Sequence, residues 1–225
     1  FLPQQLPSVP GLAIAAHWEP SRWVGGDYYD VVELGDGRLG VAIADVAGKG
    51  MSAALLMSNL QAAFRALATA DAGPAALCAR LNDILRPQMV AGKFITLFYG
   101  EYDAPARRLT YVNAGHCPSL LFSESGGVRR LEEGGLMLGA FANPDYRQQE
   151  VALQTGDLLV LYTDGVPEAE NTAGEQFGEE RLVAAFRDRA GRSPEELVAA
   201  LLAAVREHTG GEAQDDLTVV VLSAV

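Results

Sequence analysis

The sequence predicts a single α+β domain in which helices cover the faces of antiparallel β-sheets. Strand-like and helix-like patterns follow one another in the order strands, two helices, a long run of strands, two helices and one strand. The predicted strands are mostly joined by hairpin-length connections, which join antiparallel neighbours. No linker, internal repeat or low-complexity tract interrupts the chain after residue 11. We therefore expect residues 12–225 to form one domain.

The first part of the chain contains an extended segment and a predicted hairpin. Residues 1–11 carry three prolines and are expected to be the extended end of a linker. The first predicted strand covers residues 12–18. Residues 28–34 and 39–44 are predicted to pair, because Gly35-Asp36-Gly37 between them contains the Asp-Gly signal of a tight turn.

The apolar period changes to that of a helix at residue 52. Residues 52–70 are predicted to be helical, since apolar residues recur at three- and four-residue spacing. Gly73-Pro74 then breaks the pattern, and a second helix is predicted over residues 75–85.

The second half of the chain returns to strand patterns and ends with two more helices. Thr155-Gly156 is expected to join two neighbouring strands as a pair, and residues 134–139 read as a glycine-rich loop. Helices are predicted over residues 179–189 and 194–208, the latter with Ser193 as N-cap and Glu196 at capping-box spacing. Strands are predicted at residues 94–102, 108–112, 119–122, 147–153, 157–162 and 217–222.

Charge and composition exclude several classes of protein. The 225 residues include 17 Lys and Arg against 29 Asp and Glu, a net charge of −12. This acid surplus argues against a nucleic-acid binder and against docking on an anionic membrane, because both need a basic face. No apolar run approaches the roughly 20 residues of a membrane span, and no signal segment is evident, so we expect a cytoplasmic protein without membrane insertion.

Two cysteines, Cys78 and Cys117, cannot form a disulfide framework or a four-cysteine zinc site. Cys78 stands in a helical pattern and is expected to lie in the core. The first residue is Phe rather than Met, which suggests that an upstream sensor or linker has been removed.

Four aspartates stand at the ends of predicted strands: Asp27, Asp45, Asp164 and Asp215. Strand-end carboxylates can converge on one rim of a sheet core. Two carboxylates 4 Å apart repel by roughly 4 kcal/mol at an effective dielectric near 20, so a convergent group needs cations. Oxygen ligands without His or Cys favour hard ions such as Mg²⁺ or Mn²⁺. The alternative is that each aspartate is only a turn former.

The residues after Asp45 sharpen the metal hypothesis. Gly48 and Gly50 permit a tight strand-to-helix turn in which a backbone carbonyl faces a metal. The turn lacks the G-x-x-x-x-G-K-[ST] pattern of a nucleotide P-loop, which excludes that class. Gly25-Gly26-Asp27 is followed by two tyrosines rather than an acidic residue, which argues against a nucleotide cyclase.

Five motifs occur along the chain in an order that identifies a family. They are Val24-Gly25-Gly26-Asp27-Tyr28-Tyr29-Asp30, Asp45-Val46-Ala47-Gly48-Lys49-Gly50, Asn113-Ala114-Gly115-His116-Cys117-Pro118, Tyr162-Thr163-Asp164-Gly165-Val166-Pro167-Glu168-Ala169 and Asp215-Asp216-Leu217-Thr218-Val219. With them the chain resembles the SpoIIE/RsbU-like bacterial branch of the metal-dependent (PPM) serine/threonine phosphatases, which have the protein phosphatase 2C-like fold. The resemblance spans essentially the whole chain.

The resemblance implies an α-β-β-α sandwich of two antiparallel sheets flanked by helices, with two Mn²⁺ or Mg²⁺ ions at one edge. Carried over to this sequence, Asp45 would bridge both ions and the Val46 carbonyl would bind one of them. Asp164 and Asp215 would hold the other, and Asp27 would act through a metal-bound water. These four aspartates are the predicted catalytic residues. Asp216 follows the predicted ligand Asp215 and is expected to lie behind the metal ligands or to face solvent.

Three further positions remain open between a functional and a structural role. Arg22 stands five residues before Asp27, where the eukaryotic branch has a phosphate-binding Arg, and Lys49 could also contact phosphate; either could instead be an ordinary solvated side chain. His116 could bind a third metal or make structural hydrogen bonds. Where the eukaryotic branch has a His as candidate general acid, this chain has Ala47, so the proton donor is undetermined.

Roles can also be expected for two of the predicted helices and for the two tryptophans. In the family, the helices that correspond to residues 52–70 and 75–85 form a regulatory element, although an ordinary helical hairpin over a sheet fits the same residues. Trp18 and Trp23 flank Pro20 and are expected to pack, while an exposed Trp23 would suit contact with a partner near the site.

The predicted function is hydrolysis of phosphoserine or phosphothreonine in a protein by a metal-activated water. The resemblance favours a phosphorylated STAS-domain anti-anti-sigma factor as substrate, which would place the chain in sigma-factor signalling, and it implies a homodimer. The alternatives are a non-catalytic interaction module of the same fold and a hydrolase of small phosphate esters. Because an acidic enzyme repels an acidic phosphoprotein at long range, recognition should rest on the metals and a local docking surface.

Overall fold

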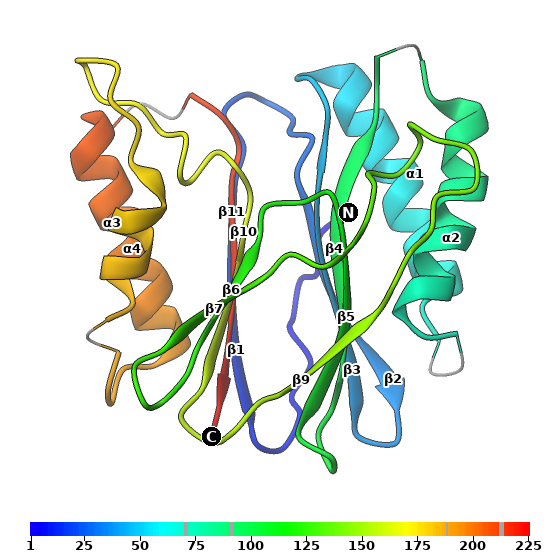
Figure 1. Cartoon of the computed structure of the whole chain (residues 1–225). Helices are drawn as coiled ribbons and strands as arrows, with labels where there is room; N and C mark the ends of the chain where they lie inside the picture. Colours follow the sequence, from blue (N-terminus) through cyan, green and yellow to red (C-terminus); the bar gives the residue numbers. More distant parts are fainter. Residues whose placement is uncertain (70–71, 91, 188, 212–213) are drawn as a thin grey trace.

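A computed structural model describes residues 1–225 with the exception of Ala70, Asp71, Ala91, Asp188, Glu212 and Ala213. Two β-sheets lie face to face, and a pair of helices covers the outer face of each sheet (Figure 1). The predicted α-β-β-α sandwich is therefore confirmed. None of the helices in the described part of the chain has the length and hydropathy that crossing a membrane requires.

The first sheet contains both the earliest and the latest strand of the chain. Its five strands follow the order β1-β11-β10-β6-β7, and all of its pairs are antiparallel. β1 pairs with β11 over eight residues, from Leu12 opposite Ala224 to Glu19 opposite Leu217. The strands are β1 (Leu12–Glu19), β6 (Ser119–Phe122), β7 (Val128–Leu131), β10 (Leu158–Tyr162) and β11 (Leu217–Ala224).

The second sheet is built around two hairpins. It follows the order β2-β3-β4-β5-β8, with β9 also paired to β5. The predicted hairpin is confirmed as β2 and β3, with Asp36 at its turn in a positive-φ conformation. The two-residue contact of β5 with β8 is parallel, so this sheet is mixed. The strands are β2 (Tyr28–Gly35), β3 (Arg38–Val46), β4 (Ile95–Asp103), β5 (Arg108–Ala114), β8 (Gly134–Gly135) and β9 (Gln149–Ala152).

The helices fall into two pairs, each connecting strands of one sheet. α1 (Met51–Leu67) and α2 (Pro74–Leu85), followed by the short 3₁₀ helix η1 (Arg86–Gln88), lie between β3 and β4. α3 (Gly178–Ala185) and α4 (Pro194–Thr209) lie between β10 and β11. The predicted capping box of α4 is present, since Glu196 N–H donates to Ser193 Oγ at 3.3 Å and Ser193 N–H donates to Glu196 Oε2 at 2.8 Å.

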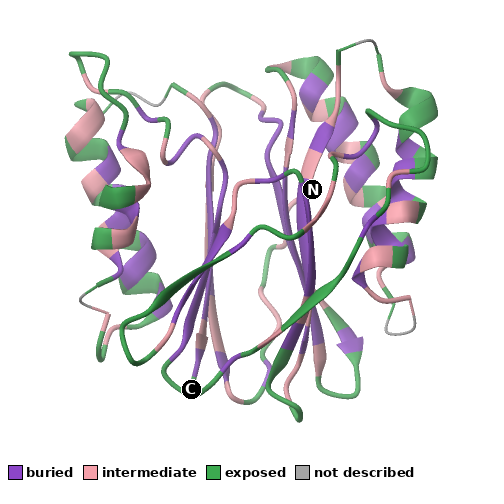
Figure 2. Cartoon of the chain, in the orientation of Figure 1, coloured by how far each residue is buried: buried purple, intermediate pink, exposed green. Residues whose placement is uncertain are grey.

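The apolar core forms three layers, visible as buried segments in Figure 2. One layer lies between the sheets and includes Ile43, Phe98 and Leu222. A second lies under α1 and α2 and contains Phe64, whose ring meets Tyr99 edge-on at 5.4 Å. The third lies under α3 and α4. Full burial of a large apolar side chain contributes roughly 1.5–3 kcal/mol, so these layers fix the relative position of the two sheets.

Several sequence-based expectations were wrong. Residues 147–153 and 157–162 do not pair: β9 lies on β5 in the second sheet, whereas β10 lies between β6 and β11 in the first. The Gly156 turn has the expected positive φ, but it passes the chain from one sheet to the other. The loop predicted at 134–139 includes β8, and β7 was not predicted.

Helix ends and one tryptophan also differ from expectation. α3 ends at Ala185 rather than at residue 189, because Phe186 turns into the core against Phe122 at 5.6 Å. Asp188 in that predicted helix, and Ala70 at the predicted end of the first helix, lie outside the described residues. Trp18 packs against the inter-sheet core, but Trp23, which was expected to pack, is fully exposed.

Candidate functional site

The four strand-end aspartates lie at one end of the sandwich, and each sheet contributes two of them. Asp27 directly precedes β2 and Asp45 is the penultimate residue of β3, so both belong to the second sheet. Asp164 lies two residues after β10 and Asp215 two residues before β11 in the first sheet. Because β10 and β11 are antiparallel neighbours, the end of one and the start of the other meet at the same rim (Figure 1).

Asp27 joins the two sheets through buried hydrogen bonds. Its side chain is 2% exposed, and Oδ2 accepts hydrogen bonds from Thr163 Oγ1 at 2.7 Å and from Thr218 Oγ1 at 2.5 Å. Burial raises the pKa of the Asp27 carboxyl well above its usual range, and the nearby Asp45 adds to the shift. The hydrogen bonds oppose it by favouring the charged form. Asp27 is therefore a positioned carboxylate in an environment that disfavours negative charge.

Asp45 and Asp164 lie in surroundings that disfavour their negatively charged forms. Burial raises the pKa of Asp45 to about 7, and repulsion from Asp164 and Asp215 contributes. Burial also raises the pKa of Asp164, with repulsion from Glu168 and Asp215 as the next causes. Ionising these groups together is costly unless positive charge is supplied.

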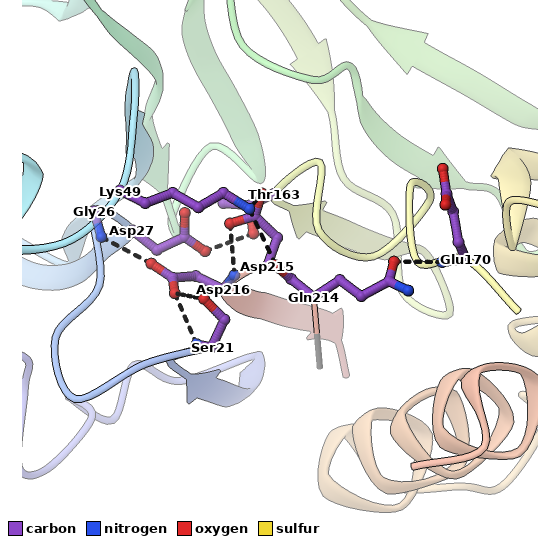
Figure 3. Close-up of polar contacts among 9 residues, drawn as sticks. All are labelled: Ser21, Gly26, Asp27, Lys49, Thr163, Glu170, Gln214, Asp215 and Asp216. Carbon is purple, nitrogen blue, oxygen red and sulfur yellow. Dashed lines mark hydrogen bonds and ion pairs between the residues drawn. The ribbon is translucent and has the colours of Figure 1, made fainter. Parts of the chain in front are cut away.

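Asp215 is the member of the group that already has a cationic neighbour. Lys49 Nζ lies 2.7 Å from Asp215 Oδ2 and also donates to the Gln214 carbonyl oxygen at 3.0 Å (Figure 3). Both side chains of the pair are roughly half exposed. Lys49, one of the predicted phosphate contacts, thus reaches across from the turn after β3 to the strand of the opposite sheet.

Asp216 is held by hydrogen bonds that the sequence did not predict. It is 8% exposed; Oδ1 accepts from Ser21 N at 2.8 Å and from Ser21 Oγ at 3.1 Å, and Oδ2 accepts from Gly26 N at 2.8 Å (Figure 3). A side chain at Gly25 would place its Cβ 2.4 Å from Asp216 Oδ2, so glycine is required there. Asp216 therefore fixes both ends of the loop that leads into Asp27.

The turn after Asp45 is held by a second lysine. Lys93 Nζ donates to the Ala47 carbonyl oxygen at 2.7 Å and lies directly over Gly48, where a Cβ would approach it to 2.1 Å. Gly48 has a φ of +93°, which favours glycine as well. The Val46 carbonyl oxygen, a predicted ligand, faces Gly26, where a Cβ would be only 3.1 Å from it. Sequence reasoning missed Lys93, since no local pattern distinguishes it from a solvated lysine.

His116 connects the two sheets beside the aspartates. Its Nδ1 is 2.8 Å from Thr96 Oγ1 in β4, and its Nε2 is 3.1 Å from the Tyr162 carbonyl oxygen at the end of β10. Burial lowers the pKa of His116 to about 4, so the ring is neutral near pH 7. The neutral ring can donate from Nε2 and accept at Nδ1. Both nitrogens have protein partners, and a third-metal role stays a prediction.

A cavity of about 420 Å³ opens at this rim. Asp45, Asp164 and Asp215 line it, whereas Asp27 does not and Arg22 lies outside it on an exposed loop. Glu168, to which sequence reasoning gave no role, adds a further carboxylate to the lining. The complete lining is Asp45, Ala47, Gly48, Lys49, Phe94, Thr96, Gly115, His116, Cys117, Asp164, Glu168 and Asp215.

The donor chemistry of this rim fits hard divalent cations. Its charged groups are mainly carboxylates, and burial, with mutual repulsion as a further cause, raises the pKa values of Asp45 and Asp164. Within the described residues, however, no three His, Cys, Asp or Glu side chains already surround a common point. Asp215 is paired with Lys49, so metal binding would need this pair to open, whereas both threonines bond only to Oδ2 of Asp27.

The chain matches a known protein family and is similar in sequence to a described bacterial protein. A family model described as Stage II sporulation protein E (SpoIIE) matches residues 35–225. The chain is 32% identical over 225 residues to the phosphoserine phosphatase RsbU of Bacillus subtilis (strain 168); the match covers 99% of this chain and 66% of that protein, just under two thirds of its length.

The fold of the chain is also similar to the folds of two solved structures. The SiaA-PP2C domain of Pseudomonas aeruginosa superposes with a TM-score of 0.83 at 26% identity, covering 93% of this chain and 85% of that one. The catalytic domain of the serine/threonine protein phosphatase PstP, solved with two manganese ions, has a TM-score of 0.65 at 19% identity and covers 95% of this chain and 98% of that one. The second likeness concerns the fold alone.

Proposed function

The chain belongs to the SpoIIE family, and on that premise we propose that it is a metal-dependent phosphatase of phosphoserine or phosphothreonine in proteins. The observation that carries the proposal is the gathering of Asp45, Asp164 and Asp215 around one cavity, with Asp27 beneath it. These carboxylates come from both sheets, and burial together with their mutual repulsion raises the pKa values of Asp45 and Asp164. Such a group suits the binding of cations.

We assign two divalent cations, Mn²⁺ or Mg²⁺, to Asp45, the Val46 carbonyl, Asp164 and Asp215, with Asp27 acting through a bound water. When bound there, such ions acidify a water for attack on phosphorus and stabilise charge on the phosphoryl oxygens. PstP was solved with two manganese ions, which supports this assignment by analogy of fold.

The protein's own residues position the reacting groups. Thr163 and Thr218 hold the Asp27 carboxylate between the sheets, and Asp216 fixes the loop that leads into it. Lys49 carries an ammonium at the cavity wall, where it can contact a phosphoryl oxygen. Arg22 lies outside the cavity and suits contact with a bound protein rather than with the reacting phosphate.

A cysteine mechanism is disfavoured by the surroundings of Cys117. Its thiol lines the cavity, but burial and the nearby Asp164 raise its pKa to about 12. The thiolate required for attack on phosphorus is then scarce near neutral pH. Water is the nucleophile that this site favours.

The similarity to RsbU supports a signalling protein as substrate. We propose that the substrate is a serine-phosphorylated STAS-domain regulator of the anti-anti-sigma type, that the chain acts as a homodimer, and that a sensor segment controls it. RsbU is described as a phosphoserine phosphatase, and the chain matches only part of its length.

Phosphate release tests the proposed chemistry. With Mn²⁺ present, the wild-type chain should hydrolyse p-nitrophenyl phosphate and a phosphoserine protein, and EDTA should abolish both activities. Asp45→Asn and Asp164→Asn should each lower turnover at least ~100-fold, because metal catalysis supplies several kcal/mol. Asp36→Asn removes the same charge from an exposed hairpin turn that tolerates Asn, and should leave turnover unchanged.

The alternatives give different results in the same assay. No hydrolysis by wild type, together with no Mn²⁺ binding in calorimetry, would identify a non-catalytic interaction module. Hydrolysis of the aryl phosphate alone would indicate a hydrolase of small phosphate esters. Near-normal rates for both site variants would show that the metal assignment is wrong.

A further inference from the structure

The loop between β1 and β2 (residues 20–27) presents a tryptophan to solvent at the rim of the proposed site. Trp23 is 100% exposed, the highest value for a large apolar side chain among the described residues. It lies four residues before Asp27, in the segment that leads directly into the buried carboxylate. Tryptophan is enriched among the residues that dominate binding at protein interfaces.

This loop is held in place on both sides of Trp23. Asp216 accepts hydrogen bonds from the backbone of Ser21, before the tryptophan, and of Gly26, after it. Both N···O distances are 2.8 Å, and Asp216, whose carboxylate accepts the two bonds, is 8% exposed. Because the loop is fixed in advance, less conformational freedom is lost when Trp23 meets a partner.

The first turns of α1, which lie next to this loop, carry two further exposed apolar side chains on the face of the helix opposite Ala53. Gly26 lies against the buried Ala53 of α1, where a Cβ at the glycine would be 3.2 Å from the alanine Cβ. On either side of Ala53, Met51 and Leu55 are 65% and 61% exposed. They are four residues apart and share one helix face. Figure 1 shows the β1–β2 connection and the start of α1 at the same end of the sandwich.

We propose that Trp23, Met51 and Leu55, the Trp23 surface, dock the folded phosphoprotein substrate next to its phosphoserine. This inference rests on the proposed phosphatase function and specifies how its site selects a protein. The surface lies on the loop that ends at Asp27 and on the first turns of α1, which follows the cavity-lining residues Gly48 and Lys49.

The net charge of the chain gives a second reason to expect apolar contact with the phosphoprotein at this surface. The chain has a net charge of −12, which opposes long-range attraction of an acidic phosphoprotein. Short-range apolar contact can then provide affinity that electrostatics cannot, and tryptophan contributes more than most residues at such contacts. Arg22 next to Trp23 adds one cation for an acidic side chain of the partner. We infer a partner with an apolar patch beside its phosphoserine.

Paired kinetics on two substrates test the docking surface. The probes are a serine-phosphorylated STAS-domain protein and p-nitrophenyl phosphate, both with Mn²⁺ and the full chain. Trp23→Ala should lower kcat/KM for the phosphoprotein at least ~10-fold and change it less than ~2-fold for the aryl phosphate, since tryptophan is among the residues that contribute most at protein interfaces. Leu55→Gln should show the same selectivity with a smaller loss.

Val128→Ala is the matched control. Val128 is 43% exposed in β7, and its register partner Phe122 pairs with Leu158 at the end of β10 farthest from Asp164. Both rates should stay at wild-type values. If Trp23→Ala and Leu55→Gln also leave the phosphoprotein rate unchanged, the docking surface is refuted while the phosphatase function stands.

Other results of these experiments would overturn the docking proposal in different ways. Aryl phosphate hydrolysis without hydrolysis of the phosphoprotein by wild type refutes the assigned partner. Failure on both substrates refutes the proposed function and the docking inference together. In sedimentation and vesicle-binding experiments, a Trp23→Ala variant that loses self-association or binding to phosphatidylglycerol vesicles would reassign the surface to a second copy or a membrane.

Discussion

Lys49 Nζ lies 2.7 Å from Asp215 Oδ2, so a lysine from the turn after β3 neutralises a carboxylate at the start of β11. The two residues stand beside strands of opposite sheets, and both line the cavity. The chain contains only two lysines, and the other, Lys93, holds the same turn through the Ala47 carbonyl. Both ammonium groups therefore act at the rim where the aspartates gather.

Lys49→Met should strengthen Mn²⁺ binding by up to about fivefold in isothermal titration calorimetry. The lysine competes with a cation for Asp215, and a half-exposed ion pair is worth up to about 1 kcal/mol. Arg147→Met is the control, because it removes another exposed cation paired with an aspartate at 2.7 Å. Weaker Mn²⁺ binding by Lys49→Met would show that the lysine supports the metal site instead of competing with it.

Asp216→Asn should weaken Mn²⁺ binding at least ~10-fold while the protein remains folded. An amide has one accepting oxygen, so it can accept from Ser21 or from Gly26 but presents its NH₂ donor to the other N–H, which releases one end of the loop that positions Asp27. Loss of such a buried bond costs about 1–3 kcal/mol of the free energy of unfolding.

Asp157→Asn provides a comparable loss of stability without the effect on metal. Asp157 is buried and accepts from Gln154 N at 2.8 Å and Glu124 N at 3.0 Å, next to the start of β10 rather than its Asp164 end. Equal loss of Mn²⁺ affinity in both variants would mean that general destabilisation, and not the loop, is responsible.

The pH dependence of stability should report His116. Its pKa is about 4 in the fold against about 6.5 in an unfolded chain, so folding favours the neutral ring. This contribution is complete above the unfolded pKa and is lost as pH falls towards 4. Between pH 7 and pH 5 the wild type should lose about 2 kcal/mol of unfolding free energy from this residue.

The measurement is urea denaturation of wild type and His116→Gln at both pH values. Glutamine does not titrate, so the variant should lose less stability between pH 7 and pH 5 than the wild type does. Equal losses in the two proteins would show that His116 is not the titrating group. Lower stability of the variant at pH 7 alone would not distinguish the two cases, because the Thr96 contact is altered as well.

Arg65→Met should destabilise the fold by about 3 kcal/mol. Arg65 of α1 donates from Nε to Asp30 Oδ2 at 2.7 Å and from Nη2 to Asp30 Oδ1 at 2.9 Å, and Asp30 in β2 is fully buried. Arg65 is half exposed, but its removal leaves the buried Asp30 carboxylate with hydrogen bonds from Tyr28 and Val31 in place of a cation. Adding Asp30→Asn should recover much of the loss in a double-mutant cycle by urea denaturation. An additive double mutant would show that the pair does not couple α1 to β2.

The sequence was most informative where a local pattern determines structure. The β2–β3 hairpin follows from an Asp-Gly turn between alternating residues, and the four aspartates were singled out because each stands at the end of an apolar run. The wrong pairing of β9 with β10 shows the limit of such signals. A turn at Gly156 predicts a change of direction, but which sheet accepts the next strand depends on distant partners.

Long-range contacts account for most of what could not be predicted. Asp216 binds Ser21 across 195 positions, Lys93 binds Ala47 across 46, and Arg65 binds Asp30 across 35. Each of these polar residues reads locally as an ordinary surface side chain. Only the three-dimensional arrangement gives them partners, and these partners fix the loop, the turn and the helix around the site.

The pairing of β1 with β11 has a consequence for how the protein is made on the ribosome. The two strands pair along their full length although about 200 residues of synthesis separate Leu12 from Leu217. Such non-local contacts form late and slow folding. Asp215 is itself translated just before β11. The nascent chain can therefore form its central hairpins early, yet it cannot complete the carboxylate group until Asp215 and β11, near the end of the sequence, have been made.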